Sequence, residues 1–335
     1  MKIIPDLLVN VAILFIMMVP GILLKKRGMV SDTFGKGISN LVLYIAQPAL
    51  IFSAYLKDFE PSVLKNALIV LLLSVIAHAI FTAVALFFFK SAPDGMRRML
   101  RFATIFSNAA FMGIPLIKEI FKADPTVVIY ASIYNITFNV FLWSLGVYIC
   151  TAKRDIDGDG VFDDKEIRKK KGEVSFLKVV FHPVNVAAML GLVFFILPIN
   201  QYVPSLITDS LDMLSGLVAP LSMLVIGLRL AEIDLRGFFK SIHLYVCLFL
   251  RHIALPLAVF GVMVLLKLVG LPITYEVFMV TMILAAAPSA SSATMFAEKY
   301  DCDAPYITKV VAVSTILSIL TMPLLCMLAD FVFVA

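Results

Sequence analysis

Two apolar segments, residues 108–115 and 284–292, each interrupted by a proline, hold the residue types best suited to binding a solute. Proline removes a backbone donor and frees a carbonyl, and within a membrane such groups persist only where protein or a watery cavity satisfies them. The prolines are offset by 173 residues, just over half of the 335-residue chain. Paired interruptions of this kind predict a transporter's binding site. The predicted site residues in these segments are Asn108, Gly113, Ile114, Pro115, Ala287, Pro288 and Ser289.

Polar side chains in other apolar segments could complete this site. Asn135 and Asn139 lie one helical turn apart, and their amides either bind a carboxylate or hydrogen-bond a neighbouring helix. Arg251 is a cation deep in an apolar segment, where charges usually mark a pathway or a paired site. It is either a substrate counter-charge or a structural clamp on the carbonyls of a broken helix. His78 is predicted to be a neutral core histidine, with proton coupling as the alternative.

A different chemistry is indicated at residues 155–166, which read DIDGDGVFDDKE. This sequence fits the calcium-loop pattern D-x-[DN]-x-[DN]-G-x₅-E at every required place. Carboxylates, one backbone carbonyl and a final bidentate glutamate are the ligands that Ca²⁺ takes in such loops. The alternative is a solvated acidic linker, balanced by the basic run 168–171. The predicted calcium ligands are Asp155, Asp157, Asp159, Val161, Asp163 and Glu166.

The composition indicates that these residues are positioned by membrane helices. Apolar residues make up 61% of the chain and charged residues 15%, against roughly 25% charged residues in soluble domains. Apolar runs of about 20 residues recur along the chain, as membrane-spanning helices require. We expect an all-α integral membrane protein with ten spans, at 5–24, 36–56, 63–89, 100–121, 126–150, 179–198, 205–228, 240–266, 275–297 and 306–333.

The basic residues predict the orientation of these spans. The loops after spans 1, 3, 5, 7 and 9 hold 21 of the 28 lysines and arginines. Because positive residues favour the cytoplasm, both termini are expected outside the cell membrane. The net charge of +5 follows from this bias and gives no indication of nucleic-acid binding.

Five spans before the long loop and five after it predict two halves of opposite orientation. Three landmarks keep nearly one offset between the halves: Pro48 with Pro220, His78 with Arg251, and Pro115 with Pro288. Ordered matches at one spacing favour an inverted repeat. The expected organisation is a first repeat at 1–150, a cytoplasmic loop at 151–178 and a second repeat at 179–335.

Cysteine spacing and enzyme motifs indicate little further chemistry. The four cysteines are scattered without a CxxC or Cys/His pattern, so they predict neither a disulfide framework nor a zinc site. No HExxH, GxSxG or phosphate-binding loop is present. We therefore do not expect an enzyme.

An ordered series of motifs resembles the auxin efflux carrier family, which includes permeases for malate and malonate. The segment from Asn108 through Met112-Gly113-Ile114-Pro115-Leu116 looks like the family's fourth helix, and Arg251 with Pro256 looks like its eighth. Pro288, the run 296–300 and the motifs at 314–315 and 320–323 resemble its ninth and tenth helices. The plant exporters' long central loop is absent, which favours a carrier of the prokaryotic type.

This resemblance implies a mechanism as well as a fold. Spans 1, 2, 6 and 7 would form a scaffold, and the others a transport domain whose fourth and ninth helices break and cross. Asn108 would contact substrate at the crossing, with a helix–helix hydrogen bond as its alternative role. The domain would move past the scaffold in alternating access, and a homodimer is an expected assembly.

The leading functional hypothesis is a secondary transporter of a small organic anion, such as a mono- or dicarboxylate. The alternatives are an exporter of aromatic or indole weak acids and a calcium-responsive sensor without transport. The sequence leaves the coupling ion, H⁺ or Na⁺, open because no acidic residue stands clearly at mid-membrane.

Overall fold

The structure is a computed structural model, and it describes residues 3–31, 33–121, 124, 126–151, 181–197, 199–232 and 241–334. Within these residues the chain is helical, and the one pairing of extended segments is a single bridge between Ser107 and Ser289. An all-helical membrane protein is thereby confirmed in outline. Six helical stretches are long and apolar enough to cross a membrane: Phe34–Tyr55, Pro61–Phe87, Thr126–Thr151, Ser205–Ala231, Ile242–Leu268 and Ala304–Phe333.

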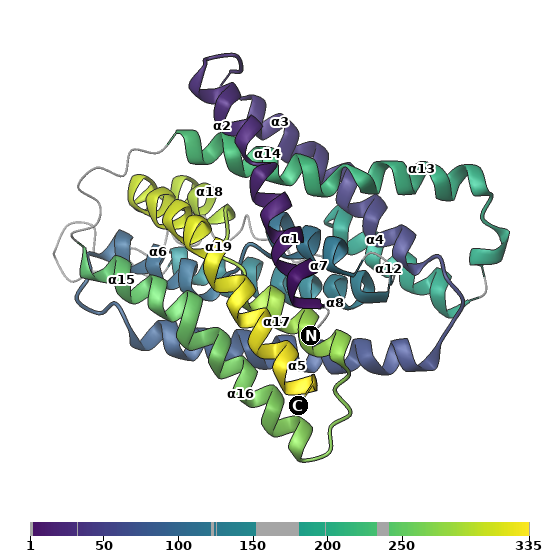
Figure 1. Ribbon diagram of the computed structural model, residues 1–335. Helices are drawn as coiled ribbons and strands as arrows, with labels where there is room; N and C mark the ends of the chain where they lie inside the picture. The colour runs from purple at the N-terminus through teal and green to yellow at the C-terminus, as the bar shows by residue number, and fades with distance from the viewer. Residues whose placement is uncertain are drawn as a thin grey trace.

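The described residues up to Thr151 form nine helices, coloured from purple to teal in Figure 1. Their bounds are α1 (Ile3–Ile16), α2 (Val19–Lys26), α3 (Phe34–Leu41), α4 (Gln47–Tyr55), α5 (Pro61–Phe87), α6 (Asp94–Ile105), α7 (Ile114–Ile120), α8 (Thr126–Phe141) and α9 (Val147–Thr151). π-Helical turns at Val42–Ala46 and Leu142–Gly146 join α3 to α4 and α8 to α9. A third, at Ala109–Gly113, precedes α7. Such turns are rare and often occur at functional sites.

The second part of the chain has eight described helices. They are α12 (Pro183–Ile196), α13 (Ser205–Gly216), α14 (Val218–Ala231), α15 (Ile242–Phe249), α16 (Leu255–Leu268), α17 (Tyr275–Ala286), α18 (Ser292–Lys299) and α19 (Ala304–Val334). A π-helical turn at Leu250–Ala254 joins α15 to α16 and carries Arg251. In Figure 1, α1 and α19 lie together near the two chain ends, and they pack against each other.

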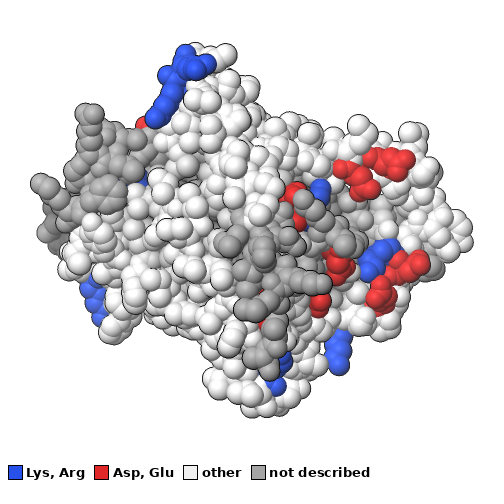
Figure 2. Space-filling view, in the orientation of Figure 1, with Lys and Arg blue, Asp and Glu red and all other residues white. Residues whose placement is uncertain are grey.

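The helices pack in two sets. In one, α2 lies against α14, and α4 lies against α12 and α13. In the other, α5, α8, α17 and α19 form the main contacts, with α18 against α19. Large apolar side chains remain exposed on many helices, and most of the surface in Figure 2 carries no charge. An apolar exterior of this kind is suited to lipid.

Two glycines allow α2 and α14 to approach closely. A Cβ atom on Gly227 would lie 2.0 Å from the carbonyl oxygen of Met18, and one on Gly21 would lie 2.3 Å from that of Leu224. Both obstacles are backbone atoms, which a rotamer change cannot move. Small residues therefore set the distance between these helices, as is common in membrane proteins.

Candidate functional site

Two helical segments are interrupted, and the interruptions pair with each other. α6 ends at Ile105 and α17 ends at Ala286, and each is followed by extended residues. The Asn108 N–H donates to the Pro288 carbonyl at 2.7 Å, and the Ala290 N–H donates to the Phe106 carbonyl at 2.9 Å. These bonds make an antiparallel bridge between Ser107 and Ser289. Each break thus satisfies backbone groups that the other leaves free, as burial in a membrane requires.

The two prolines are not equivalent in this arrangement, contrary to the constant offset in the sequence. Pro288 stands inside its break, whereas Pro115 lies in the first turn of α7, beyond the π-helical turn. The residue paired with Ser289 is Ser107, not a neighbour of Pro115. The proline spacing located the two segments, and the hydrogen bonds of the bridge decide which residues of the breaks pair.

Gln47 compensates for the backbone donor that Pro115 lacks. In the π-helical turn the Gly113 N–H bonds to the Asn108 carbonyl and the Ile114 N–H to that of Ala109. The next bond in this register would run from residue 115 to the Ala110 carbonyl, but proline has no N–H. The Gln47 Nε2 donates to that carbonyl instead. Gln47 is fully buried, and its Oε1 has no partner among the described residues.

Arg251 binds the carboxyl-terminal ends of both interrupted helices. Its Nε and Nη2 donate to the Ala287 carbonyl at 3.0 and 2.7 Å, and Nη2 also donates to the Ala285 carbonyl at 2.7 Å. Its Nη1 donates to the Thr104 carbonyl at 3.3 Å. The side chain is fully buried, and these four bonds all end on backbone carbonyls. These contacts are those of the structural clamp that the sequence offered as one of two interpretations.

Asn108 and Ser291 join the amino-terminal ends of the two helices that follow the breaks. Asn108 precedes the π-helical turn at 109–113, and Ser291 precedes α18. The Ser291 hydroxyl donates to Asn108 Oδ1 at 3.3 Å. Because this bond uses Oδ1 of the Asn108 side-chain amide, the Nδ2 group points away from Ser291. No hydrogen bond among the described residues uses Nδ2. A buried side chain, 4% exposed, therefore keeps two N–H donors for another partner.

The two asparagines of span 5 differ in their surroundings. Asn139 Nδ2 donates to Asn185 Oδ1 at 3.0 Å, which is a bond between helices α8 and α12. Asn135 is buried, and its Oδ1 has no partner among the described residues. Asn139 therefore makes the helix–helix hydrogen bond of the second interpretation, whereas the side-chain oxygen of Asn135 is unpaired among the described residues.

His252 was not predicted from the sequence to contact the site, but it is linked to the second break through Ser314. Its Nε2 lies 2.8 Å from Ser314 Oγ, which accepts the Ser289 N–H at 2.9 Å. Its Nδ1 lies 2.9 Å from Thr321 Oγ1. Ser289 Oγ itself is buried without a partner in the described part of the chain. This network forms because spans 8, 9 and 10 lie close together. In the sequence, the only signal for it was the pair of polar motifs at 314–315 and 320–323 in span 10.

Other residues singled out in the sequence are buried and packed against neighbouring side chains or backbone. Ile114 is fully buried at the start of α7, and a Cβ on Gly113 would lie 2.6 Å from the Leu284 side chain. His78 is buried, with Nδ1 2.7 Å from the Ser74 carbonyl, as expected for a core histidine. The six calcium ligands predicted at 155–166 lie outside the described residues.

Comparison with known proteins identifies the class to which this fold and site belong. The model of the family described as "Membrane transport protein" matches residues 6–326. The chain therefore belongs to this family, the auxin efflux carrier family that the sequence motifs indicated. It is a membrane transport protein and not an enzyme.

Two archaeal relatives resemble this chain over nearly its whole length. An uncharacterized transporter of Methanothermobacter thermautotrophicus is 26% identical over 307 residues, covering 91% of this chain and 92% of the relative. Another uncharacterized transporter, from Methanocaldococcus jannaschii, is 25% identical over 324 residues, covering 94% of this chain and 96% of the relative. Neither name states a substrate.

Proposed function

We propose that the chain is a secondary transporter of a small organic anion, which binds where the two interrupted segments meet. The observation that carries this proposal is the Asn108–Ser291 contact between two helix starts. Helix amino termini carry partial positive charge and attract anions. Asn108 Nδ2 adds neutral donors that bind a carboxylate without a buried charge.

The electrostatics of the bridge support an anion over a cation. The negative, carboxyl-terminal helix ends are already bound by Arg251 through Thr104, Ala285 and Ala287. The positive, amino-terminal ends at Asn108 and Ser291 have no carboxylate partner among the described residues. An anion would therefore complete the neutralisation of the four helix ends.

We assign the substrate-contacting role to Asn108, with Gln47, Asn135 and Ser289 as further polar groups around the bridge. The Ser289 hydroxyl is buried without a partner in the described residues and can donate to an anion, whereas the unpaired Gln47 Oε1 and Asn135 Oδ1 can only accept a hydrogen bond, for example from a hydroxyl of the solute. Arg251 takes a positioning role, because its hydrogen bonds hold the helix ends in place. Gly113, Ile114 and Pro115 shape the backbone that presents Asn108.

Alternating access in this proposal moves the segments of the bridge past spans 1, 2, 6 and 7. The packing of α2 on α14 and of α4 on α12 and α13 supports such a scaffold. Polar bonds join it to the interrupted segments from Gln47 to the Ala110 carbonyl, from Lys118 Nζ to the Ser215 carbonyl at 2.9 Å and hydroxyl at 3.0 Å, and from Arg229 Nη1 to the Ser291 carbonyl at 3.1 Å. The bonds of Tyr55 with Ser132 and of Asn139 with Asn185 join it to α8, and the movement would have to break them. The ten spans would form two inverted repeats in the cell membrane, with both termini outside.

A thermal-shift screen of mono- and dicarboxylates and indole acids on detergent-purified protein tests this function. Hits are then followed by flux into liposomes. We expect a stabilising anion whose effect is lost in Asn108→Ala and kept in Asn66→Ala, since Asn66 bonds Tyr130 away from the bridge. Transport that persists at wild-type rates in Asn108→Ala would refute the site. A hit restricted to indole acids would favour the aromatic substrate class.

Calcium binding at residues 155–166 is a second proposed property, supported by the complete loop motif. We expect added Ca²⁺ to protect this loop from proteolysis and to alter flux. The double variant Asp155→Asn, Glu166→Gln serves as the control, because it removes the first and last carboxylate ligands. Equal cleavage of the loop with Ca²⁺ and with a chelator would contradict calcium binding.

A further inference from the structure

Two cysteines far apart in the chain lie together at one end of the helix bundle. Cys150 is in α9, and Cys302 is in the turn between α18 and α19. The Cys302 Sγ lies 3.9 Å from the Cys150 carbonyl oxygen. Neither cysteine is in a disulfide in this structure. Their separation of 152 residues conceals the pair in the sequence.

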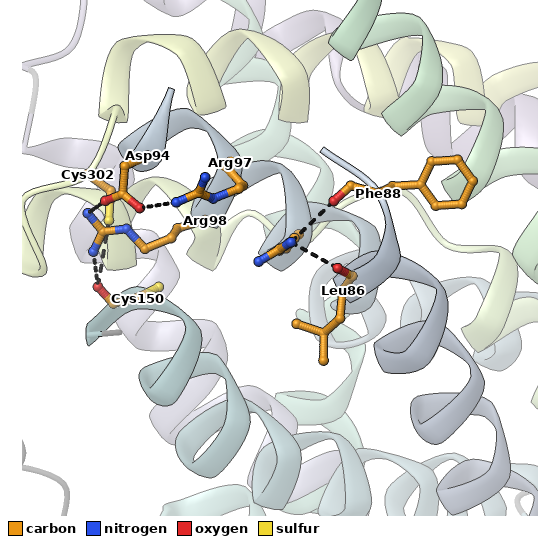
Figure 3. Close-up of polar contacts among 8 residues, drawn as sticks. Leu86, Phe88, Asp94, Arg97, Arg98, Cys150 and Cys302 are labelled. Atoms are coloured by element: carbon orange, nitrogen blue, oxygen red, sulfur yellow. Dashed lines mark hydrogen bonds and ion pairs between the residues drawn. The ribbon is translucent and has the colours of Figure 1, made fainter. Parts of the chain in front are cut away.

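Helix α6 fixes the position of Cys150. The Arg98 Nη1 donates to the Cys150 carbonyl at 2.7 Å, and Arg98 Nη2 pairs with Asp94 Oδ2 at 2.5 Å. Figure 3 shows Arg98 between Asp94 and Cys150, with the Cys302 sulfur directed at the same carbonyl. The Arg98 side chain is only 5% exposed. The end of α9 is therefore held by a buried, charge-assisted contact.

The backbone also holds Cys302 in place. Asp301 has a φ of 56°, a conformation uncommon for residues other than glycine, and the Cys302 N–H donates to the Ala297 carbonyl at 2.8 Å. On the other side, Gly95 of α6 packs against the turn, where a Cβ would be in van der Waals contact with the Asp303 nitrogen at 3.4 Å. The contact of Cys302 with the Cys150 carbonyl thus rests on three packed segments.

The two thiols differ in access, and the remaining cysteines have no thiol neighbour. Cys150 is 1% exposed, whereas Cys302 is half-buried. Cys247 contacts Thr104 and the Leu100 carbonyl, and Cys326 is buried in α19. All four cysteines lie in the described residues, so Cys150 and Cys302 are the one adjacent pair.

We propose that Cys150 and Cys302 form a redox-sensitive dithiol that closes to a disulfide when the protein meets a peroxide. The accessible Cys302 sulfur attacks the peroxide O–O bond, which yields a sulfenic acid and, from hydrogen peroxide, one water. The Cys150 sulfur then attacks the Cys302 sulfur, forms the S–S bond and releases the sulfenic oxygen as a second water. Two thiols lose two electrons in total, and the peroxide gains them.

The location of the two cysteines makes this disulfide reversible. Both cysteines lie at loops that the basic-residue bias assigns to the cytoplasm, where thiols are normally kept reduced. A disulfide there forms on oxidation and reverts with a thiol reductant. It would link the end of α9 covalently to the turn before α19. This inference does not depend on the identity of the transported solute.

Peptide mapping of the purified full-length protein tests the proposal. The protein is treated with hydrogen peroxide, blocked with N-ethylmaleimide, digested without reduction and analysed by mass spectrometry. We expect a linked Cys150–Cys302 peptide that dithiothreitol removes. Cys302→Ser and Cys150→Ser should each abolish it, whereas Cys247→Ser and Cys326→Ser should keep it. In Cys150→Ser, dimedone should trap a sulfenic acid on Cys302.

A stability measurement gives an independent readout. Oxidation should raise the thermal midpoint of the wild type reversibly and leave that of Cys302→Ser unchanged. The proposal is overturned if Cys302 of the wild type proceeds to sulfinic acid with no linked peptide. It is equally overturned if Cys247 or Cys326 enters disulfides as readily as the pair. The wild-type peptide map decides the question even if a serine variant fails to fold.

Discussion

The Ser291 hydroxyl lies 3.3 Å from Asn108 Oδ1, although the two residues are 183 positions apart in the chain. Each stands immediately before a helical turn. The contact therefore brings two helix amino termini together, while Arg251 gathers the two carboxyl-terminal ends. Two positive helix ends therefore meet near Asn108 and Ser291, and two negative helix ends meet at Arg251. Each pair of like ends is stabilised by a group of opposite charge.

Replacing Asn108 by alanine should weaken anion binding at least tenfold without unfolding the protein. A hydrogen bond to a charged group contributes about 1.5–3 kcal/mol, and the amide supplies donors that alanine lacks. Asn108→Asp should be more damaging because its carboxylate repels an anion. Isothermal titration of the best anion from the screen measures the change. Affinity unaltered by both substitutions would exclude Asn108 from the binding site.

Replacing Arg251 by methionine should lower the thermal midpoint sharply. Three buried carbonyls lose their donor, at about 1–3 kcal/mol for each group left unpaired. Arg251→Lys keeps the charge but loses the fork that reaches three carbonyls, so we expect partial destabilisation. Arg97→Met is the matched control, because Arg97 is a surface partner of Asp94, and surface pairs contribute about 0–1 kcal/mol. An unchanged midpoint with loss of anion response would instead indicate a substrate counter-charge.

The roles of Gln47 and Pro115 should be coupled. Gln47→Leu leaves the Ala110 carbonyl without a donor and should cost about 1–3 kcal/mol. Pro115→Ala restores a backbone N–H in the π-helical register, so Gln47→Leu should cost less in that background. A double-mutant cycle of unfolding midpoints measures the coupling. Gln201→Leu, at an exposed position, is the control. Strictly additive effects would mean that Gln47 does not compensate for the proline.

Gly227→Ala should destabilise the packing of α2 on α14. The new Cβ would lie 2.0 Å from the Met18 carbonyl oxygen, so the helices must separate. Gly261→Ala is the matched control, because nothing lies within 4 Å of its Cβ position, and alanine favours helix by about 1 kcal/mol. We expect a lower thermal midpoint for the first variant and an equal or higher one for the second. Equal midpoints would contradict the close approach.

Some features of the site could be predicted from the sequence, and others could not. The apolar periodicity and the motifs around Asn108, Arg251 and Pro288 predicted membrane helices and the family, because burial in lipid restricts composition along each span. The same patterns could not decide between the two roles of Arg251. Nor could they separate Asn139, which bonds Asn185, from Asn135, whose oxygen is unpaired in the described residues. Those outcomes depend on which helix faces which.

The amino-acid sequence is enough to identify a helical membrane transport protein and the two segments that carry its interruptions. Hydropathy and proline act locally, so these properties are readable along the chain. Tertiary structure alone decided that Ser107 pairs with Ser289, that Gln47 serves the carbonyl Pro115 leaves free, and that Cys150 meets Cys302. These contacts join distant residues, and only the packing of helices in three dimensions selects which buried polar groups satisfy one another.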